Sequence, residues 1–342
     1  MELEKIDGSY GEGGGQIVRS AVTLSCITGK PVEVENIRKN RRVQGLRPQH
    51  LVGIKLLAKI CDAKVDGLHV GSTSIRFHPS SVIDSELKED IKTAGSIPLI
   101  LQLLIPAVSL SKKNLKLSIT GGTDVPWSPT SNYVKFVITE AFSRIGIEFS
   151  MDIRKRGYYP KGGGHVNVQV YPCEKIESLQ LTKRTSKAAR LVCSYYRISK
   201  SLIEEQVLQT QSILKKNGFS SNYEIIEEAA LNEGCSLLAF NHGTSWITGY
   251  DTICTKGNHQ LAEIVSKNFI ENDLGVDNFL SDMLVIPLSL AEQMSIFTVK
   301  KITKHLETSL FVTSKMVGCK YGIGKLDDGY EVRIVGNSDA RV

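Results

Sequence analysis

A weak internal repeat is the feature that most constrains how this chain of 342 residues can fold. Each unit reads as helix, strand, polar loop, helix and strand, and the pattern occurs three times. The expected helix pairs span 14–27 and 49–61, then 95–110 and 131–144, and finally 281–292 and 308–318. Units of this kind bury their apolar helix faces against one another, so we expect the three repeats to pack together.

A long stretch separates the second unit from the third. It contains an expected strand at 191–197, a helix at 200–216, strands within 222–248 and a helix at 258–272. Such a segment is large enough for a small α/β domain of its own. We therefore predict an α/β fold of the α+β type, in which each repeat is a sheet backed by two helices. The large repeat domain should span 1–182 and 276–342, and the inserted domain 183–275.

The composition and the N-terminal sequence bear on the expected location of the protein. The net charge of +6 permits binding of a polyanion without requiring it. The seven cysteines are odd in number, spread along the chain and never in a CxxC pair, which argues against a disulfide framework or a zinc site and favours a reducing compartment. The N-terminus has no apolar signal region, and the longest apolar run, around 97–110, is too short to span a membrane. We expect a cytoplasmic protein without a membrane partner.

In each unit a polar loop joins the strand to the second helix. The first is a basic segment at 36–47 that includes Arg38 and Arg41, the second is Gly121–Pro129, and the third leads to His305. Equivalent loops of three packed repeats could converge on one site. Arginines in a loop with Gly and Pro can grip phosphates, although such a run is more often a solvated surface.

His305 lies between a strand-like run, 295–300, and an apolar helical run, 310–317. A histidine near a helix N-terminus and beside Lys304 can stay neutral and nucleophilic next to groups that attract phosphate. Taken alone, a surface-loop histidine is the commoner explanation.

A glycine-rich stretch, Gly11–Gln16, precedes the first helix and is suited to bind an anion. It matches neither the P-loop nor the dinucleotide-binding pattern. Glu12 within it is a candidate ligand for a divalent metal that bridges to phosphate, and a solvated glutamate in a glycine-rich turn is equally compatible. Gln102 lies within an apolar helix, where its amide must be satisfied or face a ligand.

Taken together, these stretches resemble the RNA 3′-terminal phosphate cyclase family over the whole chain and in the family's order. The matching segments are Gly11–Gln16 with Arg19 and Ser20, Asn36–Arg38, Gly45–His50, Gly121–Asp124, Gly157–Gly164, Asp282 ahead of Ile286–Leu288, and His305. The resemblance implies three repeats with a smaller inserted domain.

The resemblance also implies a reaction. A histidine attacks the α-phosphorus of ATP, releases pyrophosphate and becomes histidyl-AMP. The adenylate then passes to an RNA 3′-phosphate, and the neighbouring 2′-hydroxyl closes a 2′,3′-cyclic phosphate. His305 matches the nucleophile and Glu12 the ligand of a divalent metal, Mg or Mn.

The remaining site residues follow from the same resemblance. The nucleotide pocket would comprise Gln102, Pro129, Phe279, Leu280, Ser281, Asp282 and Met283. Contacts to the phosphates of ATP or of the RNA end would come from Arg19, Arg38, Arg41 and Gln49. Phe279 stands where the family often has tyrosine, and Met283 where it often has glutamine.

Three other functions stay open on the sequence. One is a cyclase-like RNA-processing factor that does not adenylate, which would be expected to lack His305. The second is an enolpyruvyl-transferase-like enzyme built on similar repeats. The third is an RNA-binding protein without chemistry. The physiological RNA, the preferred metal and the oligomeric state do not follow from the sequence.

Overall fold

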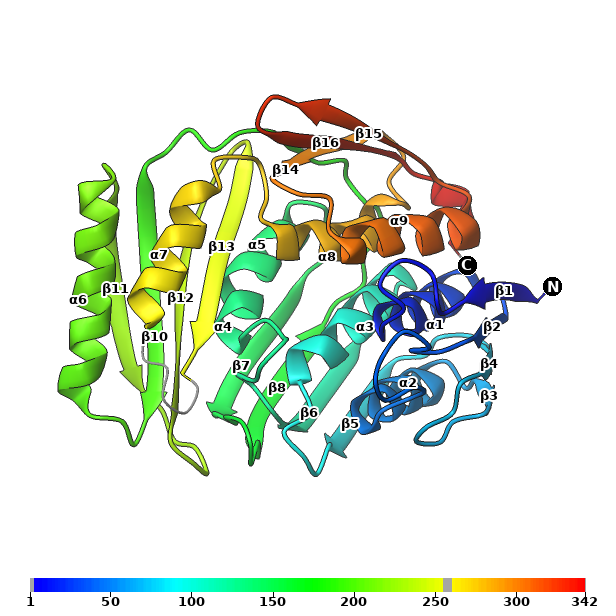
Figure 1. Ribbon diagram of the computed structural model, residues 1–342. Coiled ribbons are helices and arrows are strands. Elements are labelled where there is room, and N and C mark those ends of the chain that lie inside the picture. The colour runs from blue at the N-terminus through cyan, green and yellow to red at the C-terminus, as the bar shows by residue number, and fades with distance from the viewer. Residues whose placement is uncertain (1–2, 255–259, 342) are drawn as a thin grey trace.

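The computed structural model describes residues 3–254 and 260–341. These residues form a mixed α/β fold in which the strands belong to four sheets of four strands each (Figure 1). The helices of the main core lie between the sheets, whereas α6 (Lys200–Lys216) lies on the outer side of the sheet that contains β10 (Ala188–Tyr196) and β11 (Ser220–Glu227). Within the described residues, no helix is both long and apolar enough to cross a membrane.

Three of the four sheets belong to the repeats. The first repeat comprises β1 (Glu4–Asp7), α1 (Gln16–Thr28), β2 (Val32–Glu35), α2 (Pro48–Ile60), β3 (Lys64–Asp66) and β4 (Ile75–His78). The second comprises β5 (Ser85–Asp90), α3 (Ile97–Leu110), β6 (Leu115–Gly121), α4 (Ser131–Tyr133), a π-helical turn (Val134–Ile138), α5 (Thr139–Ser143), β7 (Phe149–Lys155) and β8 (Gly164–Val170). The third comprises β9 (Gln180–Leu181), α8 (Asn278–Leu288), β14 (Ser295–Val299), α9 (Lys304–Val317), β15 (Lys320–Leu326) and β16 (Gly329–Val335).

The three repeat sheets share one topology. In each, the spatial order is first, second, fourth and third strand of the repeat. The first two strands are parallel, and the other two pairings are antiparallel. The predicted threefold repeat is therefore confirmed. The repeat unit predicted from the sequence did not include the first strand of each repeat. These strands, β1, β5 and β9, are short or strongly polar, and β9 has only two residues.

The helices join the repeats into one core. The second helix of each repeat packs on the first helix of the next: α2 on α3, the π-helical turn on α8, and α9 on α1. Most residues of α3 are buried, in keeping with its uninterrupted apolar sequence. The packing of α9 on α1 brings the C-terminal repeat against the N-terminal one, as Figure 1 shows.

The fourth sheet enters between β9 and α8. Its elements are β10 (Ala188–Tyr196), α6 (Lys200–Lys216), β11 (Ser220–Glu227), β12 (Gly234–Gly243), β13 (Trp246–Ile253) and α7 (Leu261–Glu271). The first residues of the helix expected at 258–272 lie outside the described residues. One face of this sheet packs on α6 and α7 around a separate apolar core.

The other face of the inserted sheet joins the main core. Val192, Leu238 and Ile247 belong to that core, and the ring of Phe240 stacks on Phe136 with centroids 5.2 Å apart. The sheet is thus shared between its own helices and the second repeat. We propose that the chain divides into a large repeat domain, 1–182 and 276–342, and an inserted domain, 183–275.

One expectation about the cysteines is wrong. Cys235, at the start of β12, and Cys254, just after β13, form a disulfide with Cα atoms 5.3 Å apart. Antiparallel pairing of β12 with β13 places the two residues side by side, although 19 positions separate them along the chain. Cysteine spacing alone did not reveal this pair. The cytoplasmic location stays a prediction.

A buried ion-pair network joins the second repeat to the inserted sheet. Arg156 is only 1% exposed. Its Nη1 donates to Oδ2 of Asp124 at 3.1 Å, and its Nε donates to Oε2 of Glu228 at 2.7 Å. Nη2 donates to Asn132 and Ser194 at 2.6 and 3.0 Å. Every nitrogen of this guanidinium thus has a partner, as a charge in the interior requires.

We predict that Arg156→Met lowers the free energy of unfolding by about 3–5 kcal/mol, because Asp124 is then left as a buried charge without a cationic partner. Chemical denaturation followed by circular dichroism measures the change. Arg154→Met is the matched control: Arg154 pairs with Asp152 at the surface, so its removal should cost no more than about 0.5 kcal/mol. Equal costs for the two variants would contradict a structural role for the network.

Candidate active site

His305 lies in the first turn of α9, as the second residue of the helix. The helix was expected from residue 308, but Thr303 caps it further upstream by accepting a hydrogen bond from the Leu306 amide at 3.0 Å. The first amides of a helix have no carbonyl partner within it, so they attract negative charge. The imidazole therefore stands where an anion would be bound.

Glu12 reaches the same place from the loop between β1 and α1. Its Oε2 lies 2.7 Å from Nε2 of His305, and its Oε1 forms an ion pair with Arg41 of the basic loop. Oε2 is buried and accepts no hydrogen bond of good geometry. Segments from the first and third repeats thus meet at one carboxylate, as the sequence predicted for the basic loop and His305.

Two glycines allow the Glu12 loop to fit between its neighbours. Gly11 has a φ of +59°, and a Cβ there would lie 2.5 Å from Oγ1 of Thr308 on α9. Gly13 has a φ of +58°, and a Cβ there would lie 2.6 Å from Nδ2 of Asn40 in the basic loop. Any larger residue would be strained and would push the loop away from both partners.

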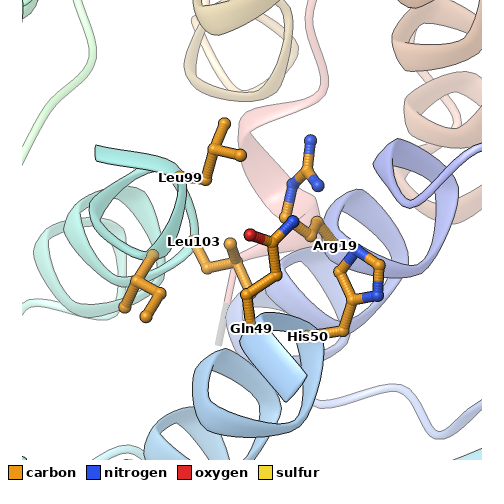
Figure 2. A pocket seen from close by; sticks show the side chains of 6 residues that line it. Arg19, Gln49, His50, Leu99 and Leu103 are labelled. Atoms are coloured by element: carbon orange, nitrogen blue, oxygen red, sulfur yellow. The ribbon is translucent and has the colours of Figure 1, made fainter. Parts of the chain in front are cut away.

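A small pocket opens beside α1, and Figure 2 shows its lining. Arg19 comes from α1, Gln49 and His50 from the start of α2, and Leu99, Ile100 and Leu103 from α3. Nη2 of Arg19 donates to Oε1 of Gln16 at 2.8 Å, whereas its buried Nε has no partner. The predicted phosphate ligands Arg19 and Gln49 therefore lie together.

Arg38 of the basic loop is incompletely paired. Its Nη2 donates only to the Val43 carbonyl at 3.3 Å, and its buried Nε has no partner. Burial lowers the pKa of Arg38, and nearby Arg47 lowers it further. Burial likewise lowers the pKa of Arg19 to about 10. Neighbouring cations that form no ion pair with a described residue, such as Arg19 and Arg38, favour binding of a polyanion such as a polyphosphate.

Asp282 on α8 is a further polar residue close to His305. Its Oδ1 accepts a hydrogen bond from Oγ1 of Thr303 at 3.3 Å. Burial raises the pKa of Asp282 to about 7, although His305 and Thr303 act in the opposite direction. The carboxyl therefore changes its charge near neutral pH, next to the imidazole.

The imidazole of His305 is held largely neutral. Burial lowers its pKa below the ordinary value, and the charge of Asp282 partly opposes this effect. The guanidinium groups of Arg19 and Arg41 lower it further. A neutral imidazole has one unprotonated nitrogen, which is the form that acts as a nucleophile.

The residues predicted for the nucleotide pocket differ in exposure. Phe279 is partly exposed and packs edge-on against Tyr133, with ring centroids 5.7 Å apart. Leu280, Ser281 and Met283 are buried in the same helix. Gln102 is partly exposed, yet its Oε1 is buried without a partner. Pro129 is buried in the loop before α4.

The loop of the second repeat makes its contacts elsewhere. Asp124 binds Arg156, and the amide of Thr130 donates to Oδ2 of Asp251 at 2.6 Å. Its Ser128 hydroxyl lies 2.5 Å from that of Ser96, the cap of α3. The structure thus brings two of the three equivalent loops to His305, and it ties the third to the inserted sheet.

Sequence reasoning missed two supporting interactions. Thr303 caps α9 and also binds Asp282, and a threonine three residues before Leu306 was an available capping signal. Gln16 donates from Nε2 to Oγ of Ser309 at 2.9 Å, which fastens α1 to α9. These two residues are 293 positions apart, so no local pattern could indicate the contact.

A neutral histidine at a helix N-terminus, beside a carboxylate and several incompletely paired guanidinium groups, is chemically suited to transfer of a phosphate-containing group to the histidine. The sequence family described as RNA 3′-terminal phosphate cyclase matches residues 10–323. This chain belongs to that family.

Individual relatives agree with the assignment. Proteins named RNA 3′-terminal phosphate cyclase from Methanococcoides burtonii and Methanosarcina acetivorans are 38% and 37% identical to this chain. Each alignment covers 96% of this chain and 99% of the relative. The protein of the same name from Thermococcus sibiricus is 37% identical over 97% of this chain and 99% of its own length. The match therefore includes the inserted region.

His50, which lines the pocket beside Arg19, is buried. Its Nδ1 accepts a hydrogen bond from the Arg47 amide at 3.0 Å, which fixes the start of α2. Burial lowers the pKa of His50 to about 3, and the nearby Arg19, Arg38 and Arg47 act in the same direction. The ring thus stays neutral in the folded protein.

This pKa predicts a pH dependence of stability. A histidine in the unfolded chain has a pKa of about 6.5, whereas that of folded His50 is about 3. Between these two pH values the unfolded chain binds a proton that folded His50 does not. The free energy of unfolding should therefore fall as the pH falls through this window. His50→Gln should reduce the slope by up to about 1.4 kcal/mol per pH unit. Urea denaturation at several pH values measures both slopes. An unchanged slope would mean that folded His50 takes up the proton.

Proposed function

We propose that this chain converts the 3′-terminal phosphate of RNA to a 2′,3′-cyclic phosphate at the expense of ATP. A nitrogen of His305 attacks the α-phosphorus of ATP, the bond to the β-phosphate oxygen breaks, and pyrophosphate leaves. The AMP group then passes from His305 to an oxygen of the RNA 3′-phosphate. Attack by the neighbouring 2′-hydroxyl expels AMP and closes the cyclic phosphate.

One observation carries this proposal: Nε2 of His305 lies at the N-terminus of α9, 2.7 Å from the Glu12 carboxylate and beside Arg41. The lowered pKa of His305 supplies an unprotonated nitrogen at neutral pH. The first-turn amides and the guanidinium groups can offset the charge that develops on the phosphate during attack.

The cations around the pocket suit the phosphates. Arg19 and Arg38 each have a buried Nε without a partner, so a phosphate oxygen would complete their hydrogen bonding. Gln49 lines the same pocket as Arg19. Arg41 is paired with Glu12, and it could turn to a phosphate when a metal takes over the carboxylate.

The adenosine part of ATP would lie between α3, α8 and the loop of the second repeat. Phe279 offers a partly exposed ring for stacking, and Gln102 offers an amide whose Oε1 lacks a partner. Asp282 can accept a hydrogen bond when ionised. Pro129 would close the other side, and the buried Leu280, Ser281 and Met283 would support the ring of Phe279 from within α8.

A divalent metal, Mg or Mn, fits this site through Glu12. Oε2 of Glu12 is buried, lies 2.7 Å from Nε2 of His305 and accepts no hydrogen bond of good geometry, so a cation could satisfy it. Within 3–254 and 260–341, no three or more His, Cys, Asp or Glu side chains gather as a metal site, so phosphate oxygens and water would supply the other ligands. When bound, the cation would neutralise phosphate charge.

The competing functions differ in one property. An enolpyruvyl-transferase-like enzyme does not fit the family match over residues 10–323. A non-adenylating processing factor or a pure RNA-binding protein would not retain AMP covalently. Incubation with α-labelled ATP and a divalent metal, followed by denaturation, separates these possibilities from the cyclase.

We predict that the parent protein retains acid-labile AMP after denaturation, whereas His305→Ala retains none and does not cyclise RNA. The variant loses only a partly exposed ring, so its unfolding transition should match that of the parent. His69→Ala, at an exposed position away from α9, is the control and should label normally. Label that persists in His305→Ala would disprove the assignment of the nucleophile.

We predict that Glu12→Gln raises the metal concentration needed for AMP transfer by about tenfold or more, because a neutral amide lacks the charge that a hard cation requires. Metal titration of protein labelling measures this shift. Glu307→Gln is the matched control, since Glu307 is an exposed carboxylate on the same helical turn as His305. Coinciding titration curves for parent and Glu12→Gln would argue against Glu12 as a ligand.

A further inference from the structure

We propose that an exposed surface formed by Trp127, Tyr159, Lys92 and Lys161 binds the single-stranded RNA chain that leads to the reacting 3′ end. The two rings would stack on bases, and the two lysines would contact phosphates. This inference rests on the proposed function for its substrate. It concerns residues outside the nucleotide pocket and the basic loop.

Trp127 is the first observation. Its side chain is 94% exposed, whereas Trp246, the chain's other tryptophan, is 8% exposed. The backbone of Trp127 has a φ of +61°, a conformation that bulky residues rarely adopt. An exposed indole held by unfavourable backbone geometry contributes nothing to the core, which points to a role in binding.

The loop that carries Trp127 is anchored on both sides. Val125 is buried before it, and after it the Ser128 hydroxyl lies 2.5 Å from that of Ser96 and donates to the Pro129 carbonyl at 3.0 Å. Two prolines flank the ring in sequence and stiffen the backbone. The indole is therefore presented on a fixed support, which lowers the entropic cost of stacking a base on it.

Tyr159 is a second exposed aromatic residue, and it lies near Trp127 at the same end of the sheet of the second repeat. It is 60% exposed and belongs to the stretch Gly157–Gly164. The amide of Thr123 donates to the Gly157 carbonyl at 2.9 Å, so this stretch lies against the Trp127 loop. The stretch was singled out in the sequence, and no role in AMP transfer has been given to it.

The two lysines come from segments that touch. Lys161 is exposed beside Tyr159, and a Cβ at Gly162 would lie 2.7 Å from Cα of Ala94. Lys92 is exposed two residues before Ala94. Rings and cations are thus contributed by three adjoining segments, around 92–96, 122–128 and 157–163.

This surface adjoins the candidate active site through α3. Ser96, which lies 2.5 Å from Ser128, caps α3 by accepting a hydrogen bond from the Leu99 amide at 3.1 Å. Leu99 lines the pocket that holds Arg19 and Gln49, as Figure 2 shows. An RNA chain whose terminal phosphate reached that pocket could continue over the Trp127 loop one helical turn away.

The chemistry matches single-stranded nucleic acid. Sites of this kind combine cations that follow the backbone with aromatic rings on which successive bases stack, and they tolerate any sequence. ATP is the competing ligand for Trp127, because Pro129 is nearby. Nucleotide pockets enclose most of the bound base, whereas the fully open ring of Trp127 has no facing wall. The exposed ring therefore favours a strand that passes over the surface.

The first test compares Trp127→Ala with the parent on a single-stranded RNA of about ten nucleotides that ends in a 3′-phosphate. We expect the KM for RNA to rise about tenfold, with AMP labelling of the protein by ATP alone unchanged. Trp127→Phe should restore most of the affinity. Tyr223→Ala, which removes an exposed ring from β11 of the inserted sheet, is the matched control and should behave as the parent.

The outcomes are distinct. An unchanged KM in Trp127→Ala would overturn the inference, and so would an equal loss of AMP labelling without RNA, since the ring would then serve ATP. Failure of the parent itself to retain AMP would instead contradict the proposed function.

Fluorescence tests the inference independently of catalysis. RNA that stacks on Trp127 should quench tryptophan emission of the parent, with similar affinity for oligouridylate and oligoadenylate. Trp127→Phe leaves only the buried Trp246 as an emitter and should lose this quenching. Quenching that persists in Trp127→Phe, or none in the parent at saturating RNA, would overturn the inference.

Discussion

The contact between α1 and α9 is the constraint on which the site depends. Gln16 binds Ser309 across it, and Gly11 lets the preceding loop pass against Thr308. Together they hold Glu12 next to His305, although the two residues belong to the first and third repeats. A phosphoryl-transfer site needs its charged groups held in place before the substrate arrives, and the helix pair provides that rigidity.

The three repeats share one topology, but their equivalent loops make different contacts. The basic loop of the first repeat and the His305 turn of the third meet at Glu12. The equivalent loop of the second repeat instead binds Arg156 and the inserted sheet through Asp124 and Thr130. Shared topology therefore sets where each loop emerges, and the side chains decide what it does. In this view the second loop presents Trp127 outward, toward RNA.

Much of this arrangement could be predicted from the sequence. Apolar periodicity located the helices of all three repeats, because their buried faces repeat at helical spacing. The first strand of each repeat escaped notice, since β9 has two residues and β5 is mostly charged. The Cys235–Cys254 disulfide and the Gln16–Ser309 contact depend on tertiary packing, so local patterns do not encode them. The family resemblance indicated His305 as nucleophile and Glu12 as metal ligand, but only the fold shows their proximity.

The central account is that His305 accepts AMP because α9 and the Glu12 loop hold it neutral among the phosphate ligands. Mass spectrometry of the protein after incubation with ATP and metal tests this most directly. After proteolysis under mildly alkaline conditions, which preserve a phosphoramidate, one AMP should be found on the peptide that contains His305, bound to its imidazole. AMP on another histidine, on a lysine such as Lys304, or on no peptide at all would contradict the account.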